Sequence, residues 1–255
     1  MRIVYDPDER ERDLLADLLP AIKHAQELWC GNWVHAFRPG RSPVTNAAAH
    51  IGRDYTLSMD LSDFFDSVSR GHLIRFLPTD LLREVDDGGI LYRGAPRQGL
   101  PTSPAACNLA ALPMDWTIIE YLETINLPQA VYTRYADDLT ISWSGDRNWA
   151  ERLKGAIPRI AEAHGFRIAR HKTRLQSARA GRRVICGVAV DNALHPTRSV
   201  RRRLRAAEHH WARTEGAARL AAVLKGEQPP KRKDGLGNKS MNGLRAWCRF
   251  VERAA

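Results

Sequence analysis

The sequence predicts an α+β fold built around a mainly antiparallel sheet. Strand and helix patterns follow one another in the order strand, helix, helix, hairpin, helix and strand, without an internal repeat. Residues 131–142 combine two runs rich in β-branched and aromatic residues around a tight turn, the composition of a hairpin. Hydrophobic residues make up 44% of the 255-residue chain, which is enough for a core and argues against global disorder. This length suits one large domain or two modest ones.

The elements of the N-terminal part are predicted from periodicity and breaker residues. Residues 8–30 carry apolar side chains with helical spacing along one stripe, formed by Leu14, Leu15, Leu18, Leu19 and Ile22. A basic loop is expected at 34–42 and the start of a short helix at 46–50. A strand at 55–61 and a helix at 69–77 follow.

The remaining elements flank the predicted hairpin. A proline- and glycine-containing loop precedes a long helix that starts at Ser103-Pro104, and an amphipathic helix ending at a glycine follows the hairpin. The C-terminal part is predicted as a strand, a very basic helix, a flexible basic loop and a last helix. In chain order these seven segments cover 95–103, 104–122, 149–165, 184–190, 195–225, 228–239 and 241–253.

The formal charge of +10 is unevenly distributed along the chain. Residues 166–255 hold 22 Lys and Arg against six Asp and Glu, whereas residues 1–165 have a net charge of −6. An acidic body followed by a basic C-terminal third suits a protein that binds a polyanion with one part and metal ions with another. The alternative is a basic, well-solvated surface without a partner.

Cysteine spacing and hydropathy indicate where the protein works. The four cysteines are far apart and form no CxxC pair, which favours reduced thiols over a zinc site or a disulfide framework. No apolar run approaches the ~18 residues that a membrane span needs, and the N-terminus lacks a signal-peptide pattern. We therefore expect a cytoplasmic protein that does not associate with membranes.

Three aspartates are the candidate metal ligands. Asp60 ends the predicted strand at 55–61, and Asp137 and Asp138 occupy the hairpin turn 77 residues later. If these strands are neighbours in one sheet, the three carboxylates converge at one edge. Such a cluster suits two Mg²⁺ ions, or Mn²⁺ in their place, for in-line nucleotidyl transfer. Taken singly, the residues also fit an ordinary acidic turn and, for Asp60, a helix cap.

The segments around these aspartates resemble the motifs of reverse transcriptases in their usual order. Residues 59–68 (MDLSDFFDSV) are similar to the first catalytic motif and residues 97–104 (RQGLPTSP) to the QGxxxSP motif. Residues 135–138 (YADD) are similar to the YxDD signature. Residues 171–173 and 184–188 resemble the two motifs that follow. The resemblance implies an RNA-directed DNA polymerase, a nucleotidyltransferase that uses dNTPs.

Within that family the chain is most similar to the retron branch. Residues 46–50 (NAAAH) resemble the retron NAxxH element, and Ile185-Cys186-Gly187 approximates its Val-Thr-Gly element. This resemblance implies a structured noncoding RNA as template and primer, an RNA–DNA hybrid as product, and antiphage defence beside an effector protein. Two rival interpretations remain: a polymerase of another defence lineage with untemplated or protein-primed synthesis, and an RNA-binding scaffold.

The family resemblance also implies a right-hand architecture with an RRM-like antiparallel palm. Fingers are expected at 1–54, a palm at 55–192 with part of the fingers inserted around 70–97, and a small basic helical thumb at 193–255. Relatives usually carry a further fingers segment ahead of Arg2. A minimal enzyme, a partner protein or RNA that completes the fingers, or a start placed too far downstream would each account for this difference.

The resemblance assigns roles in catalysis and nucleotide binding. Lys172 corresponds to the general acid that protonates pyrophosphate, and the backbone carbonyl of Leu61 to a further metal ligand. Phe65 is similar to the steric gate that selects dNTPs. The other nucleotide contacts are Gln98, Gly99, which would let backbone approach the nucleotide, and Arg2, which would bind the triphosphate. Core packing of Phe65, an exposed loop around Gln98 and one cation among many for Lys172 are the structural alternatives.

The residues expected to contact RNA or the template–primer are more widely spread. They are Arg38, Arg41, Asn46, His50, Ser103, Arg201, Arg202 and Arg205. A solvated loop is the alternative for the first two, and a structural hydrogen-bond pair for Asn46 and His50. The basic helix would follow the phosphates of an RNA–DNA duplex. Trp211 and Trp247 are expected to pack the small thumb together.

Overall fold

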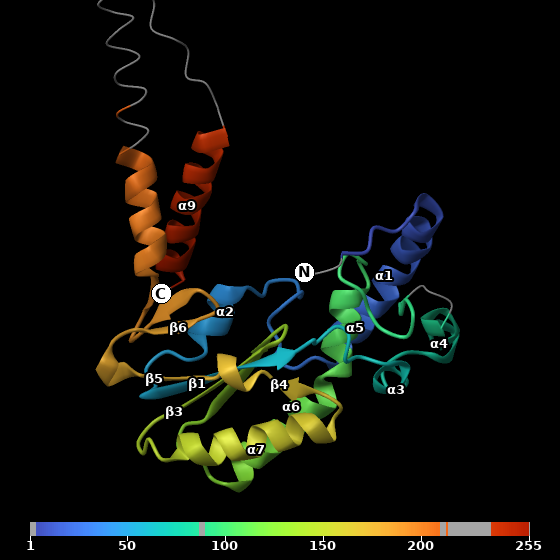
Figure 1. The fold of residues 1–255 in the computed structure, drawn as a ribbon, viewed down its shortest axis with the longest axis horizontal. Coiled ribbons are helices and arrows are strands. Elements are labelled where there is room, and N and C mark those ends of the chain that lie inside the picture. Colours follow the sequence, from blue (N-terminus) through green and yellow to red (C-terminus); the bar gives the residue numbers. More distant parts are fainter. Residues whose placement is uncertain (1–3, 87–89, 210–212, 214–235, 255) are drawn as a thin grey trace, which may run out of the picture.

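The computed structural model describes residues 4–86, 90–209, 213 and 236–254. It has an α+β fold with two antiparallel sheets, which confirms the predicted class (Figure 1). The central sheet has the order β2-β3-β1-β4, and β5 also pairs with β1. Its strands are β1 (Tyr55–Ser62), β2 (Val131–Tyr135), β3 (Asp138–Trp143), β4 (Arg167–Ile168) and β5 (Arg174–Ser177). The smaller sheet is formed by β6 (Arg183–Ile185), β7 (Val188–Val190) and β8 (Leu194–Pro196).

The helices surround the central sheet on three sides (Figure 1). The described α-helices are α1 (Glu9–Trp29), α2 (Pro43–Ala48), α3 (Arg70–Leu73), α4 (Thr79–Asp86), α5 (Ser103–Ala110), α6 (Leu112–Thr124), α7 (Trp149–Ala163), a helix at 198–209, and α9 (Leu236–Arg253). Asp8 caps α1 because its side chain accepts a hydrogen bond from the Glu11 amide, and the Glu11 carboxylate accepts one from the Asp8 amide. This capping box fixes the start of the helix.

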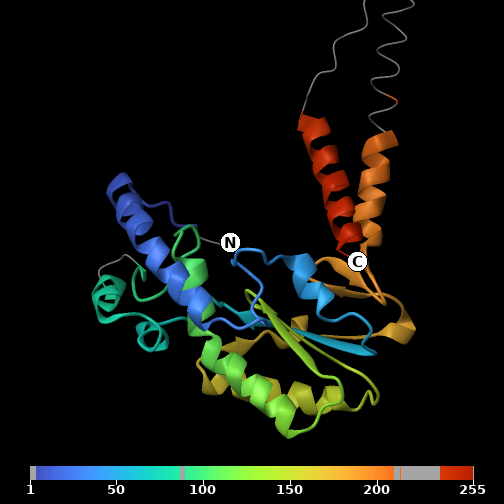
Figure 2. The same ribbon diagram turned by 180° about the vertical axis from the view of Figure 1, so that it is seen from behind.

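The two faces of the central sheet differ in polarity because successive side chains alternate. Leu57, Met59 and Leu61 of β1 point to one face together with Ile141 and Trp143 of β3, and this face packs against α6 and α7. Figure 2 shows α6 and α7 below the central sheet, seen from behind. The opposite face carries Thr56, Ser58 and Asp60 of β1 across from Ser142, Thr140 and Asp138 of β3. The apolar face packs into the core, and the polar face carries Asp60 and Asp138.

A second, smaller core joins α2 to the small sheet and α9. Val44 and Ala47 of α2 are buried together with residues of β6–β8 and with Val251, and Trp247 packs against them. This packing agrees with the predicted structural role of Trp247, whereas Trp211 lies outside the described residues. Figure 2 shows α9 and the helix at 198–209 side by side, rising from the small sheet.

Four predicted elements differ from the structure, and three of them lie in the C-terminal two thirds of the chain. The strand expected at 184–190 is the hairpin β6–β7, because Cys186 and Gly187 both have positive φ and reverse the chain there. The helix expected at 104–122 is divided at Ala111 into α5 and α6. Pro113 lacks an amide hydrogen and restricts the residue before it, which explains the break. The third difference is α9, which begins at Leu236 inside the predicted loop.

The helix expected at 69–77 is a single turn, α3, followed by the separate helix α4. The four cysteines form no disulfide, as predicted. None of the helices in the described ranges is long and apolar enough to cross a lipid bilayer.

Candidate active site

The turn between β2 and β3 is a two-residue hairpin formed by Ala136 and Asp137, with Tyr135 opposite Asp138. Ala136 has φ +56°, a backbone conformation that is energetically unfavourable for any residue with a Cβ atom. The amide of Leu61 donates a 2.9 Å hydrogen bond to the carbonyl oxygen of Asp137, so the turn is held against the end of β1. The acidic turn is therefore part of the sheet edge and not a free loop.

Asp60 and Asp138 are directly opposite each other in the β1–β3 pairing. Side chains in such a pair lie on the same face with Cβ atoms about 4.5–5.5 Å apart, and like charges there repel. Burial raises the pKa of Asp138 to about 6, and the neighbouring charges of Asp137 and Asp60 add to this shift. The sheet register thus brings Asp60 and Asp138 together, with Asp137 in the adjoining turn.

Lys172 reaches this carboxylate pair from the other side of β1. A short 3₁₀ helix, Arg170–Lys172, interrupts the edge between β4 and β5, and the amide of Ala169 donates to the carbonyl oxygen of Asp60 at 2.7 Å. This detour places Nζ of Lys172 2.6 Å from Oδ1 of Asp60. The ammonium group therefore partly neutralises the charge of Asp60, Asp137 and Asp138, which together form the acidic edge of the sheet.

The donor set fits a hard divalent cation such as Mg²⁺. In the described part of the chain no three Asp, Glu, His or Cys side chains lie close enough to form a complete metal cage. Magnesium sites in nucleotide-processing proteins need less, because Mg²⁺ is commonly held by one or two carboxylates together with substrate phosphates. Burial and the neighbouring charges of Asp137 and Asp60 together raise the pKa of Asp138, and a bound cation would relieve this repulsion between carboxylates.

A cleft of about 920 Å³ adjoins the acidic edge, and of the three aspartates Asp137 lines it, whereas Asp60 and Asp138 do not. Residues from several distant segments line it: Tyr5, Phe37, residues 61–66, Tyr92, Arg93, Arg97, Gln98, Ala136, Asp137, Ala169, His171 and Lys172. Aromatic rings, cations and carboxylates thus face the same space. A cleft of this volume accommodates a nucleotide-sized ligand.

Unfavourable backbone conformations are concentrated in this cleft. Within the described ranges, seven non-glycine residues have positive φ, and four of them line the cleft: Phe37, Asp63, Arg93 and Ala136. Such conformations persist only where the surrounding structure imposes them, and they gather at functional sites. The distribution of strain therefore supports the cleft as the functional centre, independently of the aspartates.

Phe65 and Gln98, two predicted nucleotide contacts, both line the cleft. Phe64 is the ring that points into the core, where it contacts Phe166, whereas Phe65 is half-buried and packs edge-on against Phe64. Gly99 lies next to the N-terminal segment. Its φ is +110°, and a Cβ there would collide with the carbonyl oxygen of Tyr5. The glycine therefore lets this segment approach its backbone closely.

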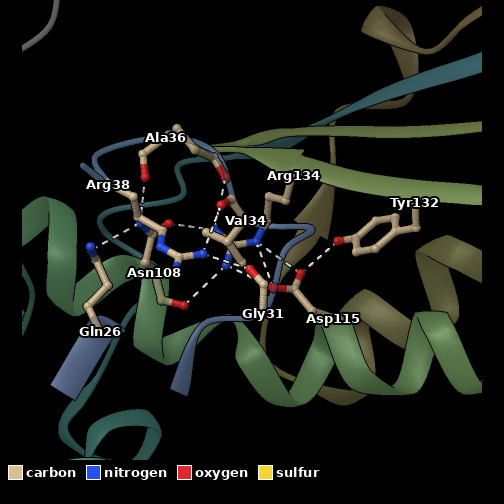
Figure 3. A network of polar contacts seen from close by, with 10 residues as sticks. Gln26, Gly31, Val34, Ala36, Arg38, Asn108, Asp115, Tyr132 and Arg134 are labelled. Carbon is tan, nitrogen blue, oxygen red and sulfur yellow. Dashed lines mark hydrogen bonds and ion pairs between the residues drawn. The ribbon is translucent and has the colours of Figure 1, made fainter. Parts of the chain in front are cut away.

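A buried ion pair that sequence reasoning missed supports the turn from behind. Arg134 of β2 and Asp115 of α6 are both fully buried and pair at 2.8 Å (Figure 3). The guanidinium also donates to Oδ1 of Asn108 at 2.9 Å and to the carbonyl of Ala136 at 3.3 Å, while the hydroxyl of Tyr132 donates to Asp115 at 2.6 Å. This network connects α5 and α6 to the turn itself.

The sequence offers one signal for this network. Arg134 interrupts an alternating strand at a position on the apolar face, where a charge needs a partner. The pattern does not say which acid provides it. Asp115 also lies among apolar residues of α6, and only the packing of α6 beneath β2 brings the two together.

Asn46 and His50 are buried and do not face the cleft surface. The ring nitrogens of His50 lie 2.6 Å from Oγ of Ser142 and 2.7 Å from Oγ1 of Thr133, so His50 ties α2 to both strands of the hairpin. Nδ2 of Asn46 lies 3.3 Å from Sγ of Cys186. Fully buried side chains present no surface to an RNA, which corrects the expectation of direct contact. Their hydrogen bonds are structural, although the two residues do not bond each other.

Ser103 and Arg38 also have protein partners. The hydroxyl of Ser103 is buried and accepts a hydrogen bond from the amide of Arg97, which corrects its assignment as a template contact. Arg38 pairs with Glu27 at 2.9 Å and donates to the carbonyl of Gly31 at 2.7 Å, which makes it an anchor for its own loop.

The remaining predicted contacts are closer to solvent. Arg41 donates to Asn32 at 2.6 Å near the surface. Arg201, Arg202 and Arg205 are exposed on the helix at 198–209. Arg201 and Arg205 share a groove with four residues of α9: Arg245, Cys248, Arg249 and Glu252. Arg2 lies outside the described residues.

The chain is similar to known proteins in sequence and in structure. Residues 10–193 match the profile of the family described as reverse transcriptase (RNA-dependent DNA polymerase). Among solved structures, the chain is similar to telomerase from Candida tropicalis in complex with a fragment of telomeric RNA. That match has a TM-score of 0.49 and 10% identity, and it covers 94% of this chain and 46% of that one.

The curated relatives are more specific. Retron Mx65 reverse transcriptase of Myxococcus xanthus is 36% identical over 248 residues, covering 89% of this chain and 56% of the relative. Retron Mx162 reverse transcriptase of the same species is 33% identical, covering 75% and 48%. Retron Ec86 reverse transcriptase of Escherichia coli is 28% identical, covering 82% and 65%. The chain spans about half to two thirds of the length of these relatives. It belongs to the reverse transcriptase (RNA-dependent DNA polymerase) family, in the retron-type branch.

Proposed function

We propose that this protein is a retron-type RNA-directed DNA polymerase that copies a structured noncoding RNA into DNA by two-metal nucleotidyl transfer. The observation that carries the proposal is the register that sets Asp60 opposite Asp138 beside the Asp137 turn. Phe65 and Gln98 line the cleft that adjoins this edge. An acidic edge, an aromatic ring and a polar amide in one cleft suit a nucleoside triphosphate.

In this proposal the architecture is that of a right hand. The palm corresponds to 55–192 with its polar sheet face, the fingers to 1–54 with the segment around 70–97, and the thumb to 193–255. The supporting observation is the separation of the two cores, one under the central sheet and one between α2, the small sheet and α9. The exposed arginines of 198–209 then contact the backbone of the RNA–DNA hybrid.

The residues of the cleft have distinct roles in the proposed reaction. When bound by Asp60, Asp137, Asp138 and the Leu61 carbonyl, two Mg²⁺ ions supply charge neutralisation and lower the pKa of the attacking hydroxyl. Phe65 excludes a nucleotide that carries a 2′-hydroxyl. Gln98 contacts the incoming nucleotide, and Lys172 gives its proton to the departing pyrophosphate.

The proposed partners follow from the retron assignment. They are the cognate RNA with its priming 2′-hydroxyl, the growing hybrid, dNTPs and an effector protein in antiphage defence. The basic C-terminal third supports the nucleic-acid partners, because 22 cations against six anions attract phosphates in a salt-dependent way.

Primer extension tests the activity. Purified protein with its bound nucleic acid should extend a primer with dNTPs and Mg²⁺, and Asp137→Ala should abolish synthesis while nucleic-acid binding persists. Asp13→Asn, on the exposed side of α1, is the matched control and should be as active as the wild type. Synthesis that persists in Asp137→Ala would refute the metal assignment, and wild-type binding without synthesis would favour an RNA-binding scaffold.

Sequencing of the co-purified nucleic acid tests the retron assignment. A branched RNA–DNA molecule with a 2′–5′ linkage is the expected product. DNA attached to protein, or DNA without a complementary RNA, would assign the enzyme to another defence lineage.

A further inference from the structure

Phe37 is an exposed aromatic side chain at the wall of the catalytic cleft. It is 48% exposed, and it lines the same cleft as Phe65, Gln98 and Asp137. Its neighbour Ala36 is completely buried, so the chain turns Phe37 outward from an otherwise internal segment. Large apolar side chains usually contribute to a core or an interface, and this ring contributes to neither within the described part of the chain.

The backbone beneath this ring is strained. Phe37 has φ +59°, which is unfavourable for a bulky residue and uncommon outside glycine and asparagine. The conformation is imposed by hydrogen bonds on both sides of the peptide. Nδ2 of Asn108 donates to the carbonyl of Ala36 at 2.8 Å, and Nε2 of Gln26 donates to the carbonyl of Phe37 at 3.1 Å.

The next residue completes the support. Arg38 donates to the carbonyls of Gly31 and Val34 at 2.7 and 3.2 Å, so the loop is closed upon itself (Figure 3). Asn108 is in turn bonded to Arg134, which also holds the Ala136 carbonyl of the catalytic turn. The same buried network therefore fixes both the acidic turn and the base of the exposed ring, and strain maintained in this way indicates function.

We propose that Phe37 is a stacking platform for a nucleobase in the catalytic cleft. The ring presents a π-face that stacks on any base, which suits a polymerase that must accept all four. No polar side chain is needed for such a contact, and the pinned loop removes most of the ordering cost of binding. The inference rests on the proposed function of the cleft and names a contact within it. The base belongs either to the template–primer or to the incoming nucleotide.

The test measures binding and catalysis separately, on the full chain. Poly(rA)·oligo(dT) with 2-aminopurine in the template is titrated with the protein in a buffer that contains Ca²⁺ in place of Mg²⁺. The fluorescence change gives the Kd for the template–primer and reports stacking on a template base without synthesis. The KM for dTTP is then measured at saturating poly(rA)·oligo(dT) with Mg²⁺. Phe37→Ala should raise either the Kd for the template–primer or the KM for dTTP by about 5- to 150-fold, the range typical of one lost base stack. A raised Kd would assign the stacked base to the template–primer, and a raised KM would assign it to the incoming nucleotide. Phe37→Tyr should restore the wild-type value.

Two further variants make the result decisive. Phe37→Leu keeps apolar volume without a ring and should resemble Phe37→Ala, whereas wild-type behaviour of Phe37→Leu would overturn the stacking proposal. Leu28→Ala removes a more accessible apolar side chain on α1, 70% exposed and outside the cleft, and should change neither constant. Unchanged constants in Phe37→Ala would also overturn the proposal. Absence of synthesis by the wild-type protein would instead refute the proposed function, because the titration with Ca²⁺ needs no chemistry.

Discussion

Nζ of Lys172 lies 2.6 Å from Oδ1 of Asp60, across the end of β1. The residues are 112 positions apart in the chain, and the short helix Arg170–Lys172 alone brings them together. The pair joins an ammonium group to a proposed metal ligand. Lys172 is therefore placed to balance charge at the acidic edge, and in the proposed reaction it protonates the leaving pyrophosphate.

Replacement of this lysine should affect chemistry more than binding. Lys172→Met is expected to slow single-turnover primer extension by about 100-fold, because a positioned general acid contributes that order of rate. Binding of the template–primer should change little. Arg170→Met removes a charge from the same 3₁₀ helix, where Arg170 faces a different groove with Lys154 and Arg159. Equal losses in both variants would show that general charge, and not the placement of Lys172, is responsible.

Sugar selection should depend on Phe65. Phe65→Ala removes the half-buried ring at the cleft and is expected to raise incorporation of rNTPs relative to dNTPs by about 10- to 100-fold, the discrimination that a pocket wall gives against one hydroxyl. The ratio of kcat/KM for UTP and dTTP measures this effect. Phe64→Leu is the control, because its ring is buried and should affect stability without changing the ratio. Unchanged selectivity in Phe65→Ala would assign Phe65 to the core.

The buried pair of Arg134 and Asp115 should be important for stability. Arg134→Met leaves the Asp115 carboxylate buried without its main partner and is expected to lower the free energy of unfolding by about 3–5 kcal/mol. Tyr132→Phe removes one hydrogen bond to the same carboxylate and should cost only about 1 kcal/mol. Urea denaturation followed by circular dichroism measures both values.

The double variant Arg134→Met with Asp115→Leu separates charge from packing. It should recover much of the stability lost in Arg134→Met, because no unpaired charge remains. Its primer extension should stay impaired, since the hydrogen bond to Ala136 is absent. Full recovery of both stability and synthesis would show that the pair does not position the turn.

His50 should make stability depend on pH. Burial lowers its pKa from 6.5 to about 3, so below pH 6.5 the unfolded chain binds a proton that the folded protein excludes. The stability that neutral His50 contributes is complete above about pH 6.5 and is lost as the pH falls toward 3. Between pH 7 and pH 5 the wild type should lose about 2 kcal/mol more than His50→Gln, as measured by urea denaturation. Equal losses of stability in the wild type and in His50→Gln would contradict this role. A difference of the same size between the wild type and His24→Gln, which replaces an exposed histidine, would contradict it as well.

The local elements and the catalytic motifs were predictable from the sequence because their signals are local. The two-residue turn at 136–137 is flanked by strand-forming residues, and the capping box at Asp8 marks the start of α1. The position of Asp60 near a strand end and the five motif segments likewise require only short windows. The hairpin at Cys186-Gly187 was missed because a continuous apolar run resembles a single strand.

What the sequence by itself determined is the set of chemical groups: three aspartates, Phe65, Gln98, Lys172 and a basic C-terminal third. Only the tertiary structure decided which of the other polar residues are internal, because burial depends on partners far away in the chain. It set Asp60 opposite Asp138, buried His50 between Thr133 and Ser142, and paired Arg134 with Asp115. It also turned Phe37 outward, since the hydrogen bonds that impose its φ come from α1 and α5.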